Sequence, residues 1–365
     1  MNTTTPKSTA DETTTRAWVD IDLGALLRNG QALAKHADVP LLPMVKADGY
    51  GLGALPVMKT LDAVEPYGWG VATVQEGREL RAAGSTKPVI VFTPMLPSEL
   101  RHVRDARLVP TLASAATIAA WAQTGGGPWH LAIDTGVSRA GVRWDCIGTV
   151  LDAVRDAPPE GAFTHFHSAE LDNGSMEIQE RRFRDAIAAL PARPTLLHAD
   201  NSAAAVRRSP SPWNLVRPGV FLYGVGSGAG AAIQPEPVAH LRARIVEIRS
   251  LNAGDSVGYD ATWIAARPSR VATLALGYAD GYRRSLGNNA DALIHGHRVP
   301  VIGTVMMDMT MLDVTDVPCA IGDSATLFGS DGGAMLTLEA VAGRGGLSPY
   351  ELLTGLRQRI ARIPK

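Results

Sequence analysis

The chain has 365 residues, 45% of them hydrophobic and 19% charged, which is long enough for two domains of about 100–200 residues each and apolar enough for a large buried core. Its 35 basic and 36 acidic residues give a formal net charge of −1, which excludes a polybasic binder of nucleic acid or of a membrane surface. No run approaches about 18 consecutive apolar residues, so we expect no membrane-spanning helix.

The first fifteen residues are polar and rich in threonine, and this composition predicts a disordered tail over residues 1–15. The tail contains no apolar run that resembles the core of a signal peptide. The two cysteines, Cys146 and Cys319, lie far apart and form neither a CxxC motif nor a disulfide framework. These features favour a reducing compartment, and we expect a cytoplasmic protein.

Short apolar runs recur between residues 16 and 240. Residues 16–22 alternate like a strand, and Asp22 is placed to cap a following helix. Eight further runs lie at 41–45, 69–73, 89–92, 108–112, 129–133, 163–166, 195–198 and 215–216. Helices are expected between them at 98–106, 114–123, 147–156 and 176–190. Pro56 is expected to break the helix after the first run.

Strands that alternate with helices pair in parallel, so eight such units indicate an α/β fold with an N-terminal (β/α)8 barrel of the TIM type. The alternative is an open, doubly wound sheet with fewer strands, because the eighth run is short. We assign residues 16–240 to the barrel.

The alternation of strands and helices ends near residue 240, where strand-like runs follow one another with only turn residues between them. They lie at 241–251, 256–261, 270–276, 292–295, 299–305, 310–314 and 325–328. Two helices are expected near 337–342 and 348–363. Residues 241–365 therefore predict a C-terminal, mainly β domain.

Polar residues follow several of the barrel strands. They are Lys46, Asp134, His165, His198, Asp200, Asn201, Ser202 and Arg217. Barrel enzymes carry their chemistry at the C-terminal ends of their strands, so this set predicts an active site. Strand ends are also polar where they simply reach solvent, but that explanation accounts for only one or two such residues.

Lys46 directly follows the buried run at 41–45. Burial lowers the pKa of an amine, and a neutral amine can form a Schiff base with a carbonyl such as the aldehyde of pyridoxal phosphate. Ser202 and the segment 217–220 (RPGV) offer donors for a phosphate. The alternative for Lys46 is a lysine whose stem lies on apolar surface while its ammonium group reaches water.

Two HxH pairs, His165 with His167 and His295 with His297, would each point to one face of a strand. Neither pair has an evident third ligand nearby. We therefore expect no metal site.

The segment MVKADGYGLG around Lys46 resembles the lysine motif of the alanine racemases, which hold pyridoxal phosphate. The resemblance continues in register along nearly the whole folded chain. It covers AIDTGVSRAG (132–141), FTHFHSAE (163–170), HADNSAAA (198–205), VRPGVFLYG (216–224), VGYDATW (257–263), LGYADGYRR (276–284) and IGTVMMDMTMLDV (302–314). It implies a pyridoxal phosphate barrel followed by a β domain, active as a head-to-tail homodimer on an amino-acid substrate.

The resemblance implies two bases on opposite faces of the substrate Cα. Lys46 would hold the cofactor as a Schiff base and act on one face, and Tyr259 of the other subunit would act on the other. Inversion requires this arrangement, because one group removes the proton and the other returns one from behind. His165 would contact and activate the tyrosine. Without the resemblance, Tyr259 reads as a packed strand tyrosine and His165 as a core histidine.

The resemblance also assigns the cofactor contacts. Arg217 would face the pyridine nitrogen, which it leaves unprotonated because an arginine does not accept a proton. The phosphate-binding positions are Tyr50, Ser202, Gly219 and Val220, and Asn201 precedes Ser202 in the same cofactor-binding motif.

The remaining implied roles concern the substrate. Arg139 would touch the cofactor's phenolic oxygen and the substrate carboxylate, and the Met307 N–H would bind that carboxylate. Tyr278 and Asp308 lie in the motifs that line the mouth of the site.

The sequence departs from the family pattern at two positions. Many members carry a carbamylated lysine two residues before the Asp of DTG, where it orients the arginine, but this chain has Ala132. An anion, a water or another side chain is then expected beside Arg139. Gln358 stands where some members have a phosphate-binding tyrosine.

The leading hypothesis is an alanine racemase that supplies D-alanine for peptidoglycan. The alternatives are an amino-acid racemase of broader or shifted specificity, acting on Ser, Lys or Arg, and a metal-assisted pyridoxal phosphate lyase of D-hydroxy amino acids. A second-face base such as Tyr259 has no purpose in the lyase. A non-catalytic cofactor-handling protein would resemble the barrel alone, whereas this resemblance also covers the β half.

Overall fold

The computed structural model describes residues 15–228 and 230–365. The predicted tail lies outside the described residues, apart from Thr15. The chain divides into two compact units, and we describe each by itself. One unit comprises residues 24–236, and the other combines 237–365 with the described residues up to Leu23. None of the helices in the described ranges is both long and apolar enough to traverse a lipid bilayer.

The first unit is built on a closed ring of eight parallel strand segments. Six of these segments pair in sequence order: β2 (Trp69–Val71), β3 (Val89–Val91), β4 (Val109–Leu112), β5 (His130–Asp134), β7 (Gly161–Phe163) and β8 (Leu196–His198). A short strand, β6 (Val142–Arg143), pairs beside β5.

Single bridges close the ring. Met44 pairs with Gly70 of β2, Asn201 after β8 pairs with Arg217, and Leu41 pairs with Val216. The first and eighth runs of the sequence are thus neighbours, as a barrel requires. The predicted TIM-like barrel is confirmed, and the open sheet is excluded.

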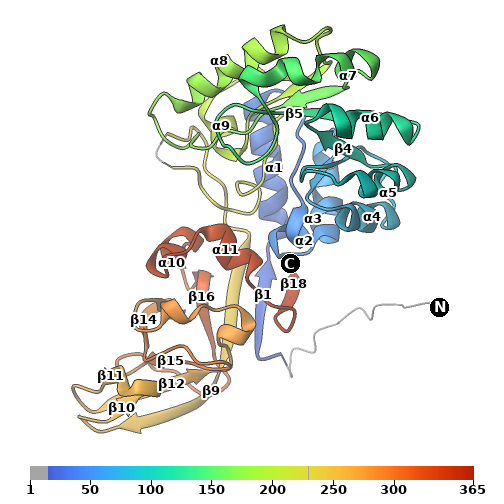
Figure 1. Cartoon of the computed structure of the whole chain (residues 1–365). Coiled ribbons are helices and arrows are strands. Elements are labelled where there is room, and N and C mark those ends of the chain that lie inside the picture. The colour runs from blue at the N-terminus through green and yellow to red at the C-terminus, as the bar shows by residue number, and fades with distance from the viewer. Residues whose placement is uncertain (1–14, 229) are drawn as a thin grey trace, which may run out of the picture. The chain divides into compact units, whose positions relative to one another are not determined.

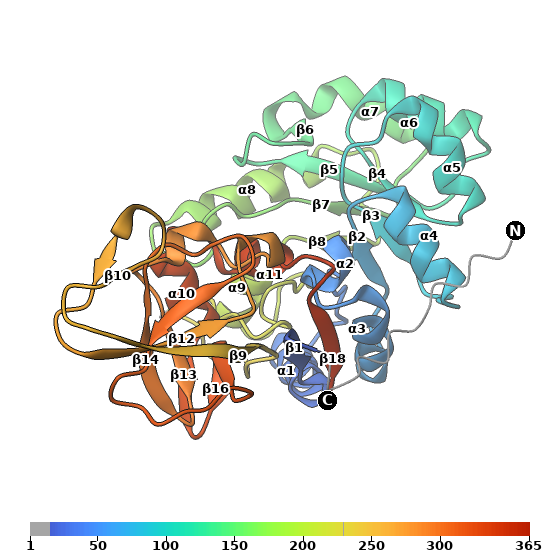
Figure 2. The ribbon, with the colours of Figure 1, turned by 90° about the horizontal axis from the view of Figure 1, so that it is seen from below.

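Helices cover the outside of the ring, and Figures 1 and 2 both show α4 to α7 beside strands β2 to β5. The helices are α1 (Leu23–Ala37), α2 (Lys46–Tyr50), α3 (Ala54–Leu61), α4 (Val74–Ala82), α5 (Leu100–Asp105), α6 (Ala115–Gln123), α7 (Leu151–Asp156), α8 (Ser175–Ala188) and α9 (Ser202–Arg207), with 3-10 turns η1 (Asp62–Val64), η2 (Pro97–Glu99) and η3 (Trp144–Val150). The four helices expected between the apolar runs, and the one expected after Asp22, are present. The expectation at Pro56 is wrong, because this residue lies in the first turn of α3, where a missing N–H costs nothing.

Helix α1 packs against the seam where the ring closes. Leu33 and Ala37 of α1 belong to one buried cluster with Leu41, Val216 and Phe221, all at most 1% exposed. The 3.6-residue period of α1 brings its apolar side chains onto one face, and the apolar runs at 41–45 and 215–216 supply the surface that this face covers. The same burial therefore fixes the helix and the two shortest segments of the ring.

The second unit is mainly β, and its largest sheet has nine strands in the order β17-β16-β13-β14-β15-β12-β9-β1-β18. The bounds are β1 (Ala17–Ile21), β9 (Ala239–Leu251), β12 (Ser269–Leu274), β13 (Asp291–Ile294), β14 (His297–Ile302), β15 (Thr310–Asp313), β16 (Ser324–Asp331), β17 (Ala334–Leu336) and β18 (Ala361–Pro364). A second sheet pairs β10 (Ser256–Val257) with β11 (Trp263–Ile264). The remaining elements are α10 (Leu338–Arg344), α11 (Pro349–Thr354), η4 (Tyr259–Ala261), η5 (Tyr278–Asp280) and η6 (Arg284–Leu286).

Strand β9 is the longest strand of this unit and organises the sheet (Figure 2). It pairs with β1, β12 and β16, and its first eight residues alternate between buried and partly exposed. That alternation is the two-residue period expected of a strand with one face on a core.

Two predictions about this unit need correction. Residues 16–23 and 237–240 are expected in the barrel, but both segments belong to the second unit, where β1 pairs with β9 on one side and with β18 on the other. The helix expected at 348–363 ends at Thr354, and 361–364 form strand β18. In both cases the main-chain groups find partners in distant segments, which local patterns do not reveal.

The seam cluster leads to a prediction about stability. Leu41→Ala should lower the free energy of unfolding by about 2–5 kcal/mol, because the cavity left behind adds to the lost burial of Leu41. Leu96→Ala is the control, since Leu96 is 64% exposed. Chemical denaturation measures both. Equal shifts of the denaturation midpoint in the two variants would contradict the role of the seam.

Candidate active site

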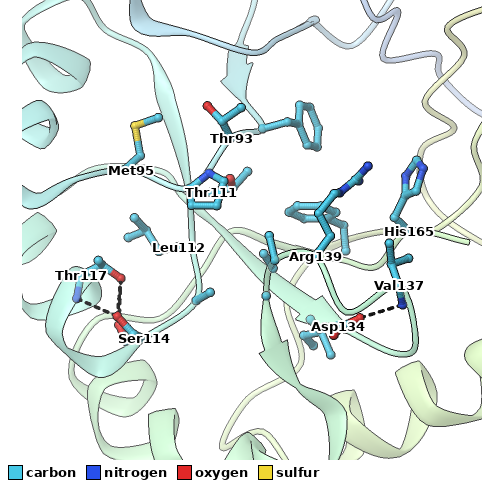
Figure 3. Close-up of a pocket in the computed structure, with 18 of the residues that line it drawn as sticks. Thr93, Met95, Thr111, Leu112, Ser114, Thr117, Asp134, Val137, Arg139 and His165 are labelled. Carbon is cyan, nitrogen blue, oxygen red and sulfur yellow. Dashed lines mark hydrogen bonds between the residues drawn. The ribbon is translucent and has the colours of Figure 1, made fainter. Parts of the chain in front are cut away.

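Three of the polar residues that follow the barrel strands, together with Arg139, line a cavity of about 530 Å³ (Figure 3). Lys46 follows the first strand segment, Asp134 ends β5, Arg139 lies in the next loop and His165 follows β7, and all four line the cavity. The rest of the lining is largely apolar. The sequence therefore predicted correctly that these positions share one end of the barrel.

The backbone after Lys46 makes a left-handed turn. The φ angles of Ala47, Asp48, Gly49 and Tyr50 are 52°, 53°, 62° and 55°. Each residue with a Cβ in this region costs about 1–2 kcal/mol, so the surrounding contacts have to hold the turn in place.

Glu76 of α4 supplies one of those contacts. Its Oε1 accepts a hydrogen bond from the Ala47 N–H at 2.7 Å, while its Oε2 accepts from the Ala72 N–H at 2.7 Å. The same carboxylate forms a capping box with Thr73 at the start of α4. The sequence analysis missed Glu76. The spacing Thr73-x-x-Glu76 indicates a capping box, but it carries no sign that the carboxylate reaches across to Ala47.

The amine of Lys46 lies beside other positive charge. Burial, and then the charge of Arg139, lower the pKa of Lys46, and Glu76 opposes this only weakly. A larger fraction of the amine is therefore neutral at a given pH. A neutral amine is the form that attacks a carbonyl or takes a proton from carbon.

A set of donors gathers at Gly219. The Ser202 Oγ accepts from the Gly219 N–H at 2.9 Å, and a Cβ on residue 219 would overlap the Tyr50 hydroxyl. The Val220 N–H makes no hydrogen bond within the described part of the chain. Tyr50 also stacks on Tyr223 with ring centroids 4.6 Å apart. A larger residue at 219 would displace the Tyr50 hydroxyl from this group, and the hydroxyls and N–H groups suit a phosphate.

Asn201 is used within the fold. Its Oδ1 caps α9 by accepting from the Ala204 N–H at 3.1 Å, and its Nδ2 donates to the Phe166 carbonyl at 3.2 Å. Both ends of the side chain are thus occupied, which holds the start of α9 beside Gly219. A direct contact of Asn201 with a cofactor remains a prediction.

Arg217 carries its charge into the barrel interior, where it is 4% exposed. One terminal nitrogen donates to the His198 carbonyl at 2.7 Å and to its Nδ1 at 3.0 Å, and the other donates to the carbonyls of Thr164 and Ala199 at 2.7 and 3.0 Å. The Nε–H has no acceptor among the described residues. Burial lowers the pKa of Arg217 to about 10, so the group stays charged at neutral pH.

His165 stays uncharged next to these cations. Burial, followed by the charges of Arg217, Arg139 and Lys46, lowers the pKa of His165 to about 3. Its backbone is held by Gln179, whose Nε2 donates to the His165 carbonyl at 2.9 Å. A neutral imidazole at this place can accept a hydrogen bond from a partner group.

Arg139 has no ion pair and no hydrogen bond within the described residues. Its loop is nevertheless well defined, because the Asp134 Oδ1 accepts from the N–H groups of Gly136, Val137 and Ser138 at 3.0–3.1 Å. Figure 3 shows Arg139 and His165 beside the same cavity. With Ala132 also lining the cavity, the guanidinium is available to a bound carboxylate or another anion.

The remaining predicted residues belong to the second unit. Tyr278, 41% exposed, lies next to the Met307 segment, since its N–H donates to the Met306 carbonyl at 2.9 Å. Met307 itself is 54% exposed. Tyr259 is 68% exposed, and its hydroxyl has no hydrogen bond within the described residues. These three side chains therefore face away from the core of their unit.

An arginine holds the segment around Asp308. Arg359 donates to Asp280 at 2.6 Å and to Asp308 at 2.5 Å. Gln358, next to Arg359, is exposed. Across residues 15–228 and 230–365, no three His, Cys, Asp or Glu side chains converge in a way that could hold a metal.

The chain is similar in sequence to known proteins of one family over nearly its whole length. Two family models match the chain, "Alanine racemase, N-terminal domain" over residues 21–227 and "Alanine racemase, C-terminal domain" over 238–364. An alanine racemase of Sorangium cellulosum is 35% identical over 372 residues, which cover 94% of this chain and 97% of that protein.

Solved structures of alanine racemases have a similar fold. Alanine racemase from E. faecalis has a TM-score of 0.90 at 29% identity, covering 96% of this chain and 98% of that one. The structure from Bartonella henselae, solved with covalently bound pyridoxal phosphate, has a TM-score of 0.89 at 28% identity, covering 96% and 100%.

The charges around Lys46 lead to a prediction. Arg139→Gln should raise the pKa of Lys46 toward that of an ordinary lysine, because the ammonium form no longer meets the repulsion of Arg139. Arg143→Gln, at an exposed arginine paired with Asp145, is the control. Competitive acetylation of cofactor-free protein across a pH series, read by peptide mass spectrometry, measures the pKa. An unchanged or lower value in Arg139→Gln would contradict the assignment.

Proposed function

The chain belongs to the alanine racemase family, and from this premise we propose that it interconverts L-alanine and D-alanine with pyridoxal phosphate as cofactor. The proposal is carried by Lys46, which has a lowered pKa and lines a cavity at the C-terminal end of a TIM-like barrel. Both domain models of the family match, so the β unit that supplies Tyr259 is included.

The residues present fit pyridoxal phosphate. The Lys46 amine would attach it, and the Tyr50 hydroxyl, Ser202 and the Gly219–Val220 backbone would hold its phosphate. The Tyr50 hydroxyl lies directly against Gly219, at the place where a Cβ would stand, and this close approach supports the placement. Asn201 would contribute by capping α9 beside this group. When bound, the cofactor draws electrons from the substrate Cα–H bond and so acidifies it.

Lys46 would move a proton on one face of the substrate Cα. Its Nζ has to be neutral to accept the proton, and burial together with Arg139 favours that form. The left-handed turn fixed by Glu76 limits the backbone freedom of the segment that carries the amine. A defined position matters because proton transfer falls off steeply with misplacement.

Tyr259 of a second subunit would act on the opposite face. An exposed tyrosine whose hydroxyl has no hydrogen-bond partner among residues 15–228 and 230–365 is available to another copy. A tyrosine has an ordinary pKa near about 10, so it needs an acceptor to act as a base. The neutral imidazole of His165 would provide that acceptor.

Arg217 would restrain the chemistry. Its free Nε–H is the donor that remains for the pyridine nitrogen, and a guanidinium does not give up its proton. Arg217 would therefore supply no proton to that nitrogen and would limit how strongly the cofactor withdraws electrons. We expect fewer side reactions such as transamination.

The substrate carboxylate would lie near Arg139, with Met307, Tyr278 and Asp308 of the β unit at the mouth of the site. The exposed Met307 and Tyr278 side chains support a surface that a second subunit covers. The functional unit would then be a homodimer with shared sites. Its product would feed peptidoglycan synthesis, and the two free cysteines suit the reducing cytoplasm.

A second candidate is a racemase of broader specificity. Ala132 and the unpaired Arg139 leave room and charge in a cavity of about 530 Å³. Such a space could admit serine, lysine or arginine side chains.

A substrate panel separates the two candidates. With pyridoxal phosphate, the protein should racemise L-alanine at least about tenfold faster than L-serine, L-lysine or L-arginine, because a pocket shaped for one methyl group discriminates on this scale. Chiral chromatography measures each rate, with Lys46→Ala as the inactive control. A faster rate on any of the other three would replace the narrow proposal by the broad one.

Tyr259→Phe tests the second base. Removal of a general acid–base group should lower racemisation by about 10²–10⁴-fold. In heavy water, Cα exchange from one enantiomer should survive far better than from the other, because Lys46 still serves one face. Tyr350→Phe, at an exposed tyrosine of the same unit, is the control. Equal loss of exchange from both enantiomers would refute the two-base assignment.

A further inference from the structure

A row of side chains in mutual contact leads from Arg217 into the barrel interior. Arg217 contacts the His198 Nδ1 at 3.0 Å, and the His198 Nε2 lies 2.7 Å from the His130 Nδ1. Both histidines are fully buried. Beyond them, the His130 Nε2 lies 3.9 Å from the Glu160 carboxylate, and it has no hydrogen-bond partner.

Because Arg217 can only donate, the position of the proton on each histidine ring of this row is determined. A guanidinium only donates, so the His198 Nδ1 has to accept and carries no proton. The neutral His198 ring then bears its proton on Nε2 and donates it to the His130 Nδ1. His130 in turn bears its proton on Nε2, which faces Glu160. Both rings thus present their acceptor side toward the cation of Arg217.

The packing reserves space for this arrangement. A Cβ on Gly161 would lie 2.6 Å from ring atoms of His130, so the absence of a side chain at this position of β7 makes room for the ring. Phe163 stacks on the His198 ring with centroids 5.2 Å apart and planes 9° from parallel. His130 starts β5 and His198 ends β8, so two separate strands meet through this single hydrogen bond.

We propose that His130 is a positioning residue, which fixes the tautomer of His198 and thereby the place of the Arg217 guanidinium. This rests on the proposed function, in which Arg217 serves the pyridine ring of the cofactor. Without the His130 acceptor, the buried Nε2–H of His198 has no partner. The ring then favours the other tautomer, which directs an N–H at Arg217 and pushes the guanidinium away from its carbonyl acceptors.

Two variants of nearly equal size separate this role from simple packing. The Oδ1 in His130→Asn can accept the His198 Nε2–H, whereas the side chain in His130→Leu cannot. We expect His130→Leu to bind pyridoxal phosphate at least about tenfold more weakly than wild type, because a buried donor without an acceptor destabilises the site by a free energy of this order. His130→Asn should stay within about threefold of wild type. Fluorescence titration gives the affinities, and denaturation confirms that each variant is folded.

The tautomer gives a second readout that needs neither cofactor nor activity. Nitrogen NMR of histidine-labelled, cofactor-free wild type should show both His198 and His130 protonated on Nε2 alone. His130→Leu should shift His198 toward the Nδ1–H form. The opposite tautomers in wild type, an affinity unchanged in His130→Leu, or equal weakening in both variants would overturn the proposal. If wild type binds no cofactor, the proposed function fails, while the tautomers still decide the role of His130.

Discussion

The guanidinium of Arg217 holds a positive charge inside the barrel, and among the described residues only neutral acceptors hydrogen-bond to it. Three main-chain carbonyls and one imidazole nitrogen take all the N–H groups of its two terminal nitrogens. Among the described residues no carboxylate forms an ion pair with it, and the more distant Asp200 offsets the effect of burial on the pKa of Arg217 only in part, so its charge acts on the neighbouring groups. Together with burial, it lowers the pKa of His165 and of His130 to about 3 in each case.

Burial and this charge keep the neighbouring histidines neutral, and a neutral His165 is what the proposed chemistry needs. The Lys46 amine, next to Arg139, has to accept a proton, and the His165 ring has to accept a hydrogen bond from tyrosine. A carboxylate beside Arg217 would reduce this effect and would also offer the pyridine nitrogen a proton. Glu76 is compatible with a lowered lysine pKa although it holds the turn after Lys46. Its carboxylate accepts hydrogen bonds from backbone N–H groups, and it raises the pKa of Lys46 by less than burial and Arg139 lower it.

Much of the fold could be predicted from the sequence, because strands buried on both faces read as continuous apolar runs and strand ends read as polar residues. That reasoning located the barrel and placed Lys46, Asp134 and His165 at one end of it, where they line one cavity, whereas Arg139 was expected only from the resemblance to the family. It failed where distant segments decide the structure. Strand β18 is held by β1, some 340 residues away in the chain, and no local pattern records that pairing. Glu76 and His130 were missed for the same reason, since each acts through one contact with another strand or turn.

The protonation of the buried histidines tests this account most directly. Nitrogen NMR of histidine-labelled protein, followed from pH 7 down to pH 5, reports the charge of each ring. Burial and the charge of Arg217 should keep His130, His165 and His198 neutral throughout, because together they lower the pKa of His130 and of His165 to about 3 and hold the pKa of His198 well below its usual value. Protonation of any of the three above pH 5 would show that burial and the charge of Arg217 do not keep these rings neutral, and would contradict the account.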